Sequence, residues 1–363
     1  MDFSFTTEQL AVQELAARIL GDSLTHERLR ELTDRGEHID AGVWQHLAEA
    51  GLVGIGLPEA HGGAGQGFVA IMLVLEQIGR HVAPVPYYAS VVLGALPVAR
   101  FGTDAQQAAL LPGVVDGSLV LTGAYQELGA DAHHPSATAT QAQGGAWTIS
   151  GQKDFVPAGL DAHRLVVSAR TGDGVALFLV DPSVGGTEVI RQDTTTGIPE
   201  ARITFDAAPA ELLAAGQDAL DWVLDHAMTA LCAMGVGVFD RELRMTAEYT
   251  STRKQFDKPL ASFQAVGQRA ADAFIDTEAI RLTTWQAAWR LEQNLPASTE
   301  VTIAKYWLAE GGQRVAAAAQ HLHGGIGVDR DYPLHRYYLW AKWLQLALGS
   351  ASDHLQRLGA SMA

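Results

Sequence analysis

The pattern of hydrophobic and polar positions divides the 363-residue chain into a helical, a β and a second helical segment. In the first segment hydrophobic residues recur at helical spacing. They do so in "TTEQLAVQELAARIL", where a threonine is suited to cap the helix, and in the mostly apolar "FVAIMLVLEQIGRHV". The stretch between them, "GLVGIGLPEAHGGAGQG", is interrupted by glycines and is predicted to be a loop.

After residue 117 the pattern changes to short β-branched runs separated by Gly, Asp and Pro, as in "RLVVSAR", "VALFLVD" and "TEVIRQ". Such runs predict an antiparallel sheet. After Ala214 helical spacing returns over four long stretches, and residues 331–360 are predicted to form the last helix. The predicted fold is multidomain α+β, with an N-terminal α-helical domain (1–117), a middle β domain (118–210) and a C-terminal four-helix bundle (211–363).

The amino-acid composition limits the kinds of partner and the cellular compartment that we expect for the protein. A hydrophobic fraction of 48% with 18% charged residues is ordinary for a soluble globular protein, and a net charge of −16 argues against nucleic acid or an anionic membrane as a partner. The single cysteine, Cys232, cannot form an intrachain disulfide, which is typical of a reducing cytoplasm. The N-terminus lacks a signal-peptide pattern and the histidines lack repeated metal-ligand spacing, so we expect a cytoplasmic protein without a metal site.

The loop "TSTRKQFDKPLASFQAVGQR" joins two of the long predicted helices and is the most informative stretch. It places Arg253, Lys254 and Lys258 close to Phe256 in the sequence. Ser262 stands where it could cap the next helix. Clustered cations, an aromatic ring and a helix N-terminus together suit a diphosphate with a stacked ring. Taken alone, the same residues are also explained by a solvated basic loop.

These residues resemble the loop R-x-x-F-G-x-x-L/I-x-x-x-Q of the acyl-CoA dehydrogenases. The stretches "LAEAGLVGIGLPEAHGGAGQG", "ISGQKDF" and "HGGIGVDRDYPLHRYY" resemble other segments of that family, in order along nearly the whole chain. The resemblance is closest to subunits of heteromeric acyl-CoA dehydrogenases from actinobacterial steroid side-chain degradation. It implies FAD shared between adjacent subunits, and the residues that reach the neighbour's FAD are largely retained: Arg253, Phe256, Gln264, His321 (usually Gln), Gly324 and Gly325.

The same resemblance implies that this chain has no catalytic residue. Dehydrogenation removes a proton from Cα of the acyl-CoA while a hydride leaves Cβ, and the proton requires a carboxylate base. The family places its Glu either in the last helix or early in the first helix of the C-terminal bundle. The matching positions here are Leu348 and Ala227, and neither aliphatic side chain accepts a proton.

The contacts that the family makes to the flavin ring differ as well. Its T-E-P-x-A-G-S-D becomes "AYQELGAD", so that Ala124 and Ala130 replace two hydroxyl residues. Its W-I-T becomes "FVP", in which Phe155 keeps an aromatic face while Pro157 lacks both a hydroxyl and an N–H.

The chain thus lacks the base and the flavin-ring contacts of the family but keeps the residues that reach the neighbour's FAD. This one-sided loss predicts a partner (β) subunit of an α2β2 enzyme, which completes the FAD site of a catalytic subunit. By resemblance the acyl-CoA is a steroid side-chain CoA thioester bound mainly by that subunit, and the acceptor is an electron-transfer flavoprotein. Two alternatives remain open: a homo-oligomeric acyl-CoA dehydrogenase with a relocated base, and a flavin-free scaffold that binds an acyl-CoA or a protein. Asp225, Asp240 and Glu242 could supply a relocated base, although surface or intersubunit pairing explains them more simply.

Overall fold

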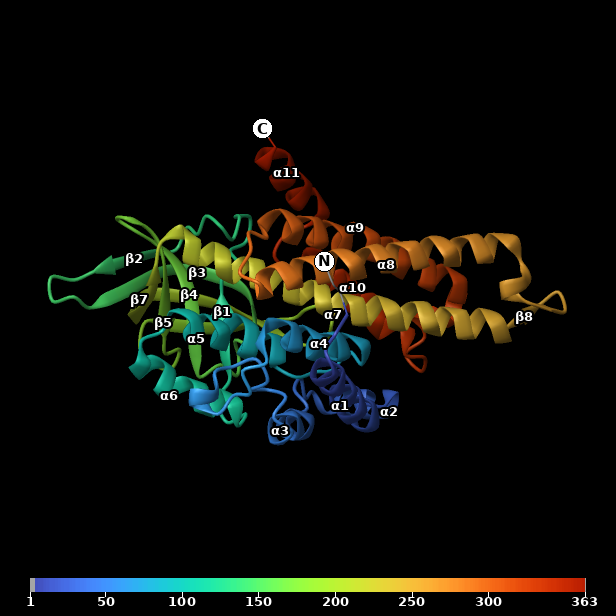
Figure 1. Ribbon diagram of the computed structural model, residues 1–363, viewed down its shortest axis with the longest axis horizontal. Coiled ribbons are helices and arrows are strands. Elements are labelled where there is room, and N and C mark those ends of the chain that lie inside the picture. Colours follow the sequence, from blue (N-terminus) through green and yellow to red (C-terminus); the bar gives the residue numbers. More distant parts are fainter. Residues whose placement is uncertain (1–3, 363) are drawn as a thin grey trace. The chain divides into compact units, whose positions relative to one another are not determined.

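A computed structural model describes residues 4–362, and the helical and β segments occur in the predicted order (Figure 1). Thr6 caps the first helix as predicted, because its side chain accepts from the N–H of Gln9 while the Gln9 side chain accepts from the N–H of Thr6. A π-helical stretch, η2 (Tyr88–Ala95), leads into α5. The N-terminal helices are α1 (Thr7–Ser23), α2 (His26–Arg35), α3 (Ala41–Glu49), α4 (Gly67–Arg80), α5 (Leu96–Phe101) and α6 (Asp104–Val115).

The middle segment forms a seven-stranded sheet that closes on itself. Its strands are β1 (Leu121–Ala124), β2 (Thr138–Gln141), β3 (Trp147–Pro157), β4 (Arg164–Thr171), β5 (Gly174–Val180), β6 (Thr187–Gln192) and β7 (Glu200–Ala215). Neighbours follow the order β1-β4-β2-β3-β7-β5, β6 pairs with β7, and an additional pairing of β4 with β5 closes the ring. The predicted antiparallel pairing is confirmed for most neighbours but is wrong for β1–β4 and β2–β4, which are parallel. Side-chain alternation sets the faces of a strand and leaves the direction of a distant partner open.

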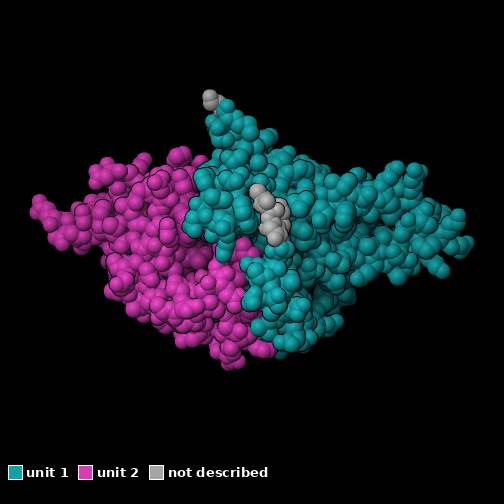
Figure 2. Space-filling view, viewed as in Figure 1, with its two compact units in different colours: residues 1–36, 72–83, 228–363 teal, residues 37–71, 84–227 magenta. Residues whose placement is uncertain are grey.

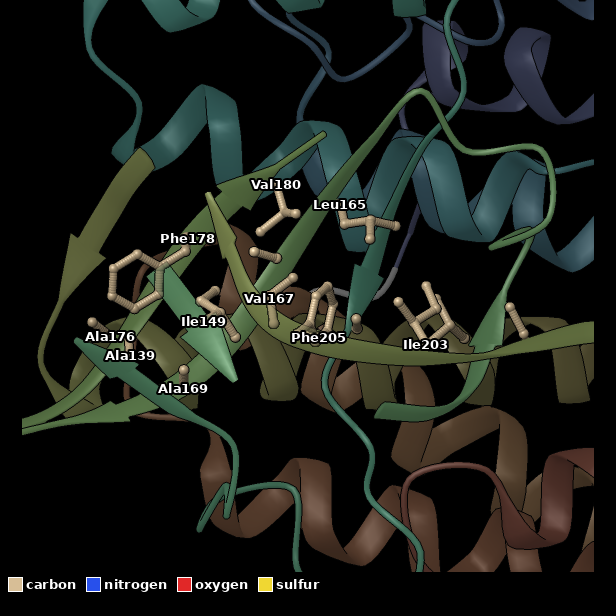
Figure 3. Packing of buried hydrophobic residues seen from close by; sticks show 14 residues of the cluster. Ala139, Ile149, Leu165, Val167, Ala169, Ala176, Phe178, Val180, Ile203 and Phe205 are labelled. Carbon is tan, nitrogen blue, oxygen red and sulfur yellow. The ribbon is translucent and has the colours of Figure 1, made fainter. Parts of the chain in front are cut away.

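Hydrophobic side chains fill the interior of this ring (Figure 3). Leu165 and Val167, alternate residues of β4, belong to this core. They are joined by Ile149 of β3 and Phe178 of β5, and all four are fully buried. Each side chain of this size contributes roughly 1.5–3 kcal/mol on burial. Because side chains occupy the inside of the ring, a ligand of this segment must bind against its outer surface or its loops.

The C-terminal segment consists of helices joined by short turns. The elements are α7 (Gln217–Thr252), β8 (Lys254–Gln255), β9 (Lys258–Pro259), α8 (Gln264–Glu292), α9 (Ser298–His323), α10 (Leu334–Leu346) and α11 (Ala351–Ser361). The prediction of one helix over residues 331–360 is wrong, because the chain turns between α10 and α11. Leu348 and Gly349 adopt positive φ angles of 56° and 106° in this turn. The helical spacing on both sides of the turn conceals it in the sequence.

By their internal contacts the described residues fall into two compact units (Figure 2). The first unit comprises the chain through Gly36, residues 72–83 and the chain from Met228 onward. The second unit comprises residues 37–71 and 84–227. Since α4 and α7 each contribute to both units, the division into three domains at residues 117 and 210 stays a prediction.

Within the first unit, α4 and α7 cross at two glycines. A Cβ atom on Gly79 would lie 1.9 Å from the carbonyl oxygen of Met234, and one on Gly237 would lie 1.9 Å from that of Glu76. No larger residue fits at either crossing point. By length and composition alone α7 could span a membrane, but 94% of its most apolar window is buried inside the structure. Packing therefore accounts for the apolar character of α7.

Candidate functional site

The first part of the predicted FAD set lies on the exposed hairpin between α7 and α8, in the first unit. Phe256 is at its tip, with a φ of 52° and 88% of its surface exposed. Among residues 4–362, the Arg253 guanidinium has no hydrogen-bond or ion-pair partner. The prediction that Ser262 caps α8 is wrong, since its hydroxyl donates to the Pro259 carbonyl at 2.7 Å. No side chain caps α8, which begins at the exposed Gln264.

The second part of the set lies where α9 ends. His321 is exposed in the last turn of the helix. Gly324 follows with a φ of 66° and a ψ of −141°, a conformation that residues with a Cβ atom rarely adopt. A Cβ atom on Gly324 or Gly325 would meet nothing within 4 Å. The backbone at these glycines is therefore open to the close approach of a ligand.

An aromatic cluster joins the two parts, and sequence reasoning missed it. Tyr249, one turn before Arg253, stacks on the His323 imidazole with ring centroids 4.6 Å apart. The His323 ring also hydrogen-bonds with the Tyr332 hydroxyl at 3.1 Å and the Ala319 carbonyl at 2.8 Å. These contacts hold the end of α7 against the end of α9. The sequence offered no signal for the partners of His323.

Leu348, one expected position of the family's Glu, lies in a firmly held turn of the first unit. The fully buried Lys305 of α9 donates to the carbonyl oxygens of Leu344 (3.1 Å) and Gly349 (3.0 Å). The His354 ring hydrogen-bonds with the Leu348 carbonyl at 3.1 Å. Burial lowers the pKa of Lys305 to about 8 and that of His354 to about 4. Polar contacts thus hold the backbone of this turn, while the side chain at the expected position is aliphatic.

Ala227, the other expected position, is fully buried on the part of α7 that belongs to the second unit. The adjacent His226 stacks on Trp222 with ring centroids 3.8 Å apart and meets the edge of Phe68 at 4.6 Å. Burial lowers the pKa of His226 to about 4, so the imidazole is neutral at physiological pH. The residue that precedes Ala227 thus lies among aromatic rings, and the Tyr88 hydroxyl donates to the Ala227 carbonyl at 3.4 Å.

Asp240, considered above as a relocated base, is an ion-pair centre inside the first unit. It accepts hydrogen bonds from Arg80 (2.5 Å), Arg244 (2.7 Å) and Arg281 (3.0 Å). The expectation of surface or intersubunit pairing is therefore wrong for this residue. Burial opposes the ionisation of Asp240, but the arginines outweigh it and lower the pKa. A carboxylate held as an anion in this way is a poor proton acceptor.

Glu242 is also buried, and the expectation of surface pairing is wrong for it too. Among the described residues neither of its carboxylate oxygens has a hydrogen-bond partner. Burial raises its pKa to about 8. A pKa in this range is typical of catalytic carboxylates, but Glu242 and Ala227 are 15 residues apart on α7. At 1.5 Å per residue this is about 22 Å along the helix, so Glu242 does not substitute for a base at Ala227. Asp225, the third carboxylate, is buried as well.

The residues expected beside a flavin ring lie in the second unit and offer few donors. Ala124 is fully buried at the end of β1, whereas Ala130 is exposed. Phe155 adopts a φ of 52° and is 37% exposed, so part of its ring faces solvent. The Pro157 carbonyl accepts a hydrogen bond of 2.6 Å from the Thr122 hydroxyl. That hydroxyl is thus occupied, and the alanines and the proline have no side-chain donor.

An ion-pair network that the sequence analysis missed occupies the same region. Asp154, next to Phe155 and 2% exposed, accepts hydrogen bonds from Arg202 (2.8 Å), Gln152 (3.0 Å) and the N–H of Leu128 (3.1 Å). Burial opposes the ionisation of Asp154, but these donors prevail and lower its pKa. Leu128 belongs to "AYQELGAD", so the stretch that holds the flavin in the family is bound here to the chain's own strand β3.

The predicted ADP-end residues of the first unit and the residues expected beside the flavin ring in the second unit form two donor sets. These two donor sets differ in what they can bind. The first unit presents a guanidinium, an exposed ring, an uncapped helix N-terminus and open glycine backbone, which fit a diphosphate with an attached aromatic group. The second unit presents alanines, a proline and a self-paired network in place of ring contacts. Within residues 4–362, no group of three His, Cys, Asp or Glu side chains is placed to hold a metal ion.

Comparison with known proteins gives a consistent result along the whole chain. Residues 6–118, 121–207 and 214–363 match the N-terminal, middle and C-terminal domains of acyl-CoA dehydrogenase, respectively. "Acyl-CoA dehydrogenase FadE27" of Mycobacterium tuberculosis (strain ATCC 25618 / H37Rv) is 37% identical over 100% of this chain and 99% of its own length.

Two solved structures are similar over nearly their full length. A structure described as the Tcur3481-Tcur3483 steroid ACAD has 46% sequence identity and a TM-score of 0.92, covering 97% of each chain. The ChsE4-ChsE5 complex from Mycobacterium tuberculosis has 37% identity and a TM-score of 0.95, covering 100% of this chain and 99% of its own.

Proposed function

Because the chain belongs to the acyl-CoA dehydrogenase family, we propose that it is the non-catalytic (β) subunit of a heteromeric, FAD-dependent member of that family. It pairs with a catalytic subunit in an α2β2 assembly and contacts the ADP end of the FAD whose ring the partner binds. The observation that supports this most directly is the contrast between the two donor sets. The Arg253 guanidinium has no partner within residues 4–362 and Phe256 is exposed, while the stretch expected to hold the ring is bound to Asp154.

FAD supplies the hydride acceptor when it is bound, and this chain's residues position its ADP end. Arg253 would donate to diphosphate oxygens, and Phe256 would pack against the ligand with its exposed ring. Gln264 and His321 add hydrogen-bonding side chains, and the glycines at the end of α9 allow close approach of the backbone. No proton transfer is assigned to this chain, since Leu348 and Ala227 carry no carboxylate.

The substrate in this proposal is a steroid side-chain CoA thioester held mainly by the catalytic subunit. It is supported by the 46% identity to a structure described as a steroid ACAD. The pairing with a second, different chain is supported by the similarity to the ChsE4-ChsE5 complex. We place the reaction in the cytoplasm, with an electron-transfer flavoprotein as the acceptor of the electrons from FAD.

Expression of the chain alone and together with a catalytic acyl-CoA dehydrogenase subunit tests the proposal. We expect a colourless protein from the chain alone and a yellow, active complex from the pair. A yellow, active protein from the chain alone would favour a homo-oligomeric enzyme with a relocated base. If Arg253→Ala leaves the FAD content of the complex unchanged, the proposed contact of this chain with the ADP end of FAD is wrong.

A further inference from the structure

The aromatic cluster of Tyr249, His323 and Tyr332 joins the two parts of the predicted FAD set, although none of its members belongs to that set. Tyr249 comes from the end of α7, His323 from the end of α9 and Tyr332 from the turn before α10, all in the first compact unit. The ring centroids of Tyr249 and His323 are 4.6 Å apart, and those of His323 and Tyr332 are 5.3 Å apart. The cluster thus connects three segments of the chain.

Tyr249 is hydrogen-bonded to the backbone of the residue that carries the predicted diphosphate donor. The N–H of Arg253 donates to the Tyr249 carbonyl at 2.8 Å, and the Arg253 carbonyl accepts from the N–H of Leu260 at 2.8 Å. From there the hairpin projects past the end of α7 (Figure 1), and Phe256 at its tip is 88% exposed. The backbone of Arg253 is therefore fixed at the base of the hairpin, through Tyr249.

His323 is held on the other side of the stack in one orientation. Its Nδ1 lies 2.8 Å from the Ala319 carbonyl, which can only accept, so Nδ1 carries the proton. In the neutral ring Nε2 then accepts from the Tyr332 hydroxyl at 3.1 Å. Burial lowers the pKa of His323, which favours this neutral form. The ring cannot turn without losing both hydrogen bonds.

Gly324, a member of the predicted FAD set, directly follows this fixed ring. Its N–H donates to the Gln320 carbonyl, and the Gln320 side-chain amide donates to its carbonyl at 3.3 Å. With His323 held by Tyr249 and Tyr332, the open backbone at Gly324 has a fixed place relative to the base of the hairpin.

Building on the proposed function, we infer that Tyr249 and His323 are positioning residues for the diphosphate end of FAD. Their stack sets the separation between Arg253 and the backbone at Gly324, so that both reach one ligand that the two rings do not touch. A site that is in place before binding avoids the cost of ordering its parts. Ordering one long side chain on binding weakens affinity about 2- to 12-fold. Loss of the stack should weaken FAD binding by this factor while every proposed contact residue is still present.

Titration of FAD into the deflavinated complex tests this role. We expect Tyr249→Leu to bind FAD about 2- to 12-fold more weakly than wild type. Tyr249→Phe should keep the wild-type affinity, because it retains the stacked ring and the Tyr249 hydroxyl has no hydrogen-bond partner within residues 4–362. Tyr306→Leu is the matched control and should also bind like wild type, since Tyr306 lies 17 residues before His323 on α9, about 26 Å along the helix.

A milder variant covers the case in which Tyr249→Leu does not fold. Tyr332→Phe removes only the hydroxyl that donates to His323, and it should weaken FAD binding in the same direction by a smaller factor. Wild-type affinity of both Tyr249→Leu and Tyr332→Phe would overturn the inference.

A double-mutant cycle with Arg253→Ala shows whether the stack acts through Arg253. If it does, Tyr249→Leu should cost less affinity in the Arg253→Ala background than in wild type. An equal loss in both backgrounds would refute the positioning role. The cycle also separates the two proposals. Wild-type affinity of Arg253→Ala removes the proposed function, whereas a loss for Arg253→Ala without one for Tyr249→Leu removes only the positioning role.

Discussion

Arg253 is the residue whose removal should affect FAD binding most directly. A charge-assisted hydrogen bond contributes about 1.5–3 kcal/mol, and about 1.4 kcal/mol corresponds to a tenfold change in affinity. We expect Arg253→Ala to weaken FAD binding by the complex about 10- to 150-fold. Arg253→Lys should keep only part of the wild-type affinity, because Lys offers a point charge without the parallel N–H donors of a planar guanidinium. Titration of FAD into the deflavinated complex measures both, with Arg269→Ala on α8 as the control. An unchanged affinity for Arg253→Ala would mean that the loop is only a solvated basic turn.

Glu242 should make the stability of the protein depend on pH. Its folded-state pKa is about 8 and that of an unfolded chain about 4.3, so the folded state binds this proton more tightly. The corresponding stabilisation is complete below the unfolded value and is lost as pH rises through the folded value. The charge of Lys342 on α10 acts on Glu242 in the opposite sense to burial, and Glu242 in turn adds to burial in raising the pKa of Tyr337.

The test compares Glu242→Gln with wild type. Because glutamine does not titrate, we expect the melting temperature of the variant to rise relative to wild type from about pH 5 to about pH 8 and then to level off. Exposed Glu248→Gln on the same helix should show no such trend. A constant difference between Glu242→Gln and wild type across this range would contradict the assignment.

At the scale of elements, the turn between α10 and α11 has a firmly held backbone but carries Leu348 in place of the acidic residue of the family. Leu348→Glu would place a carboxylate on this turn, which Lys305 and His354 hold in place. We expect the turnover of the complex to stay at the wild-type value, because the chemistry takes place on the partner's flavin. Steady-state kinetics of the complex and of the isolated variant measure this. Turnover gained by the isolated Leu348→Glu chain would show that it carries a flavin ring of its own.

At the scale of the whole molecule, the contrast between the two donor sets predicts how many FAD molecules the assembly binds. We expect an α2β2 tetramer with two FADs, at the two sites whose ring contacts come from the catalytic subunit. Native mass spectrometry gives the subunit composition, and flavin absorbance after denaturation gives the FAD content. Four FADs per tetramer, or a stable flavin-loaded homotetramer of this chain, would be incompatible with the proposed division of labour.

The sequence by itself determined the family and the order of helices and strands, and it predicted the residues of the ADP-end loop. Helical spacing, the Thr6 cap and the run from Arg253 to Gln264 depend on residues that are close along the chain. Such local patterns remain visible without a fold, because the backbone geometry that they reflect repeats every two to four residues.

Only the tertiary structure decided how distant residues meet. The parallel pairing of β1 with β4, the stacking of Tyr249 on His323 and the burial of Glu242 each depend on partners from other elements. The same holds for the hydrogen-bond network of Asp154. Local propensity says nothing about which side chains fill a given site or which charges lie unpaired, because burial and hydrogen-bond satisfaction are properties of the packed chain.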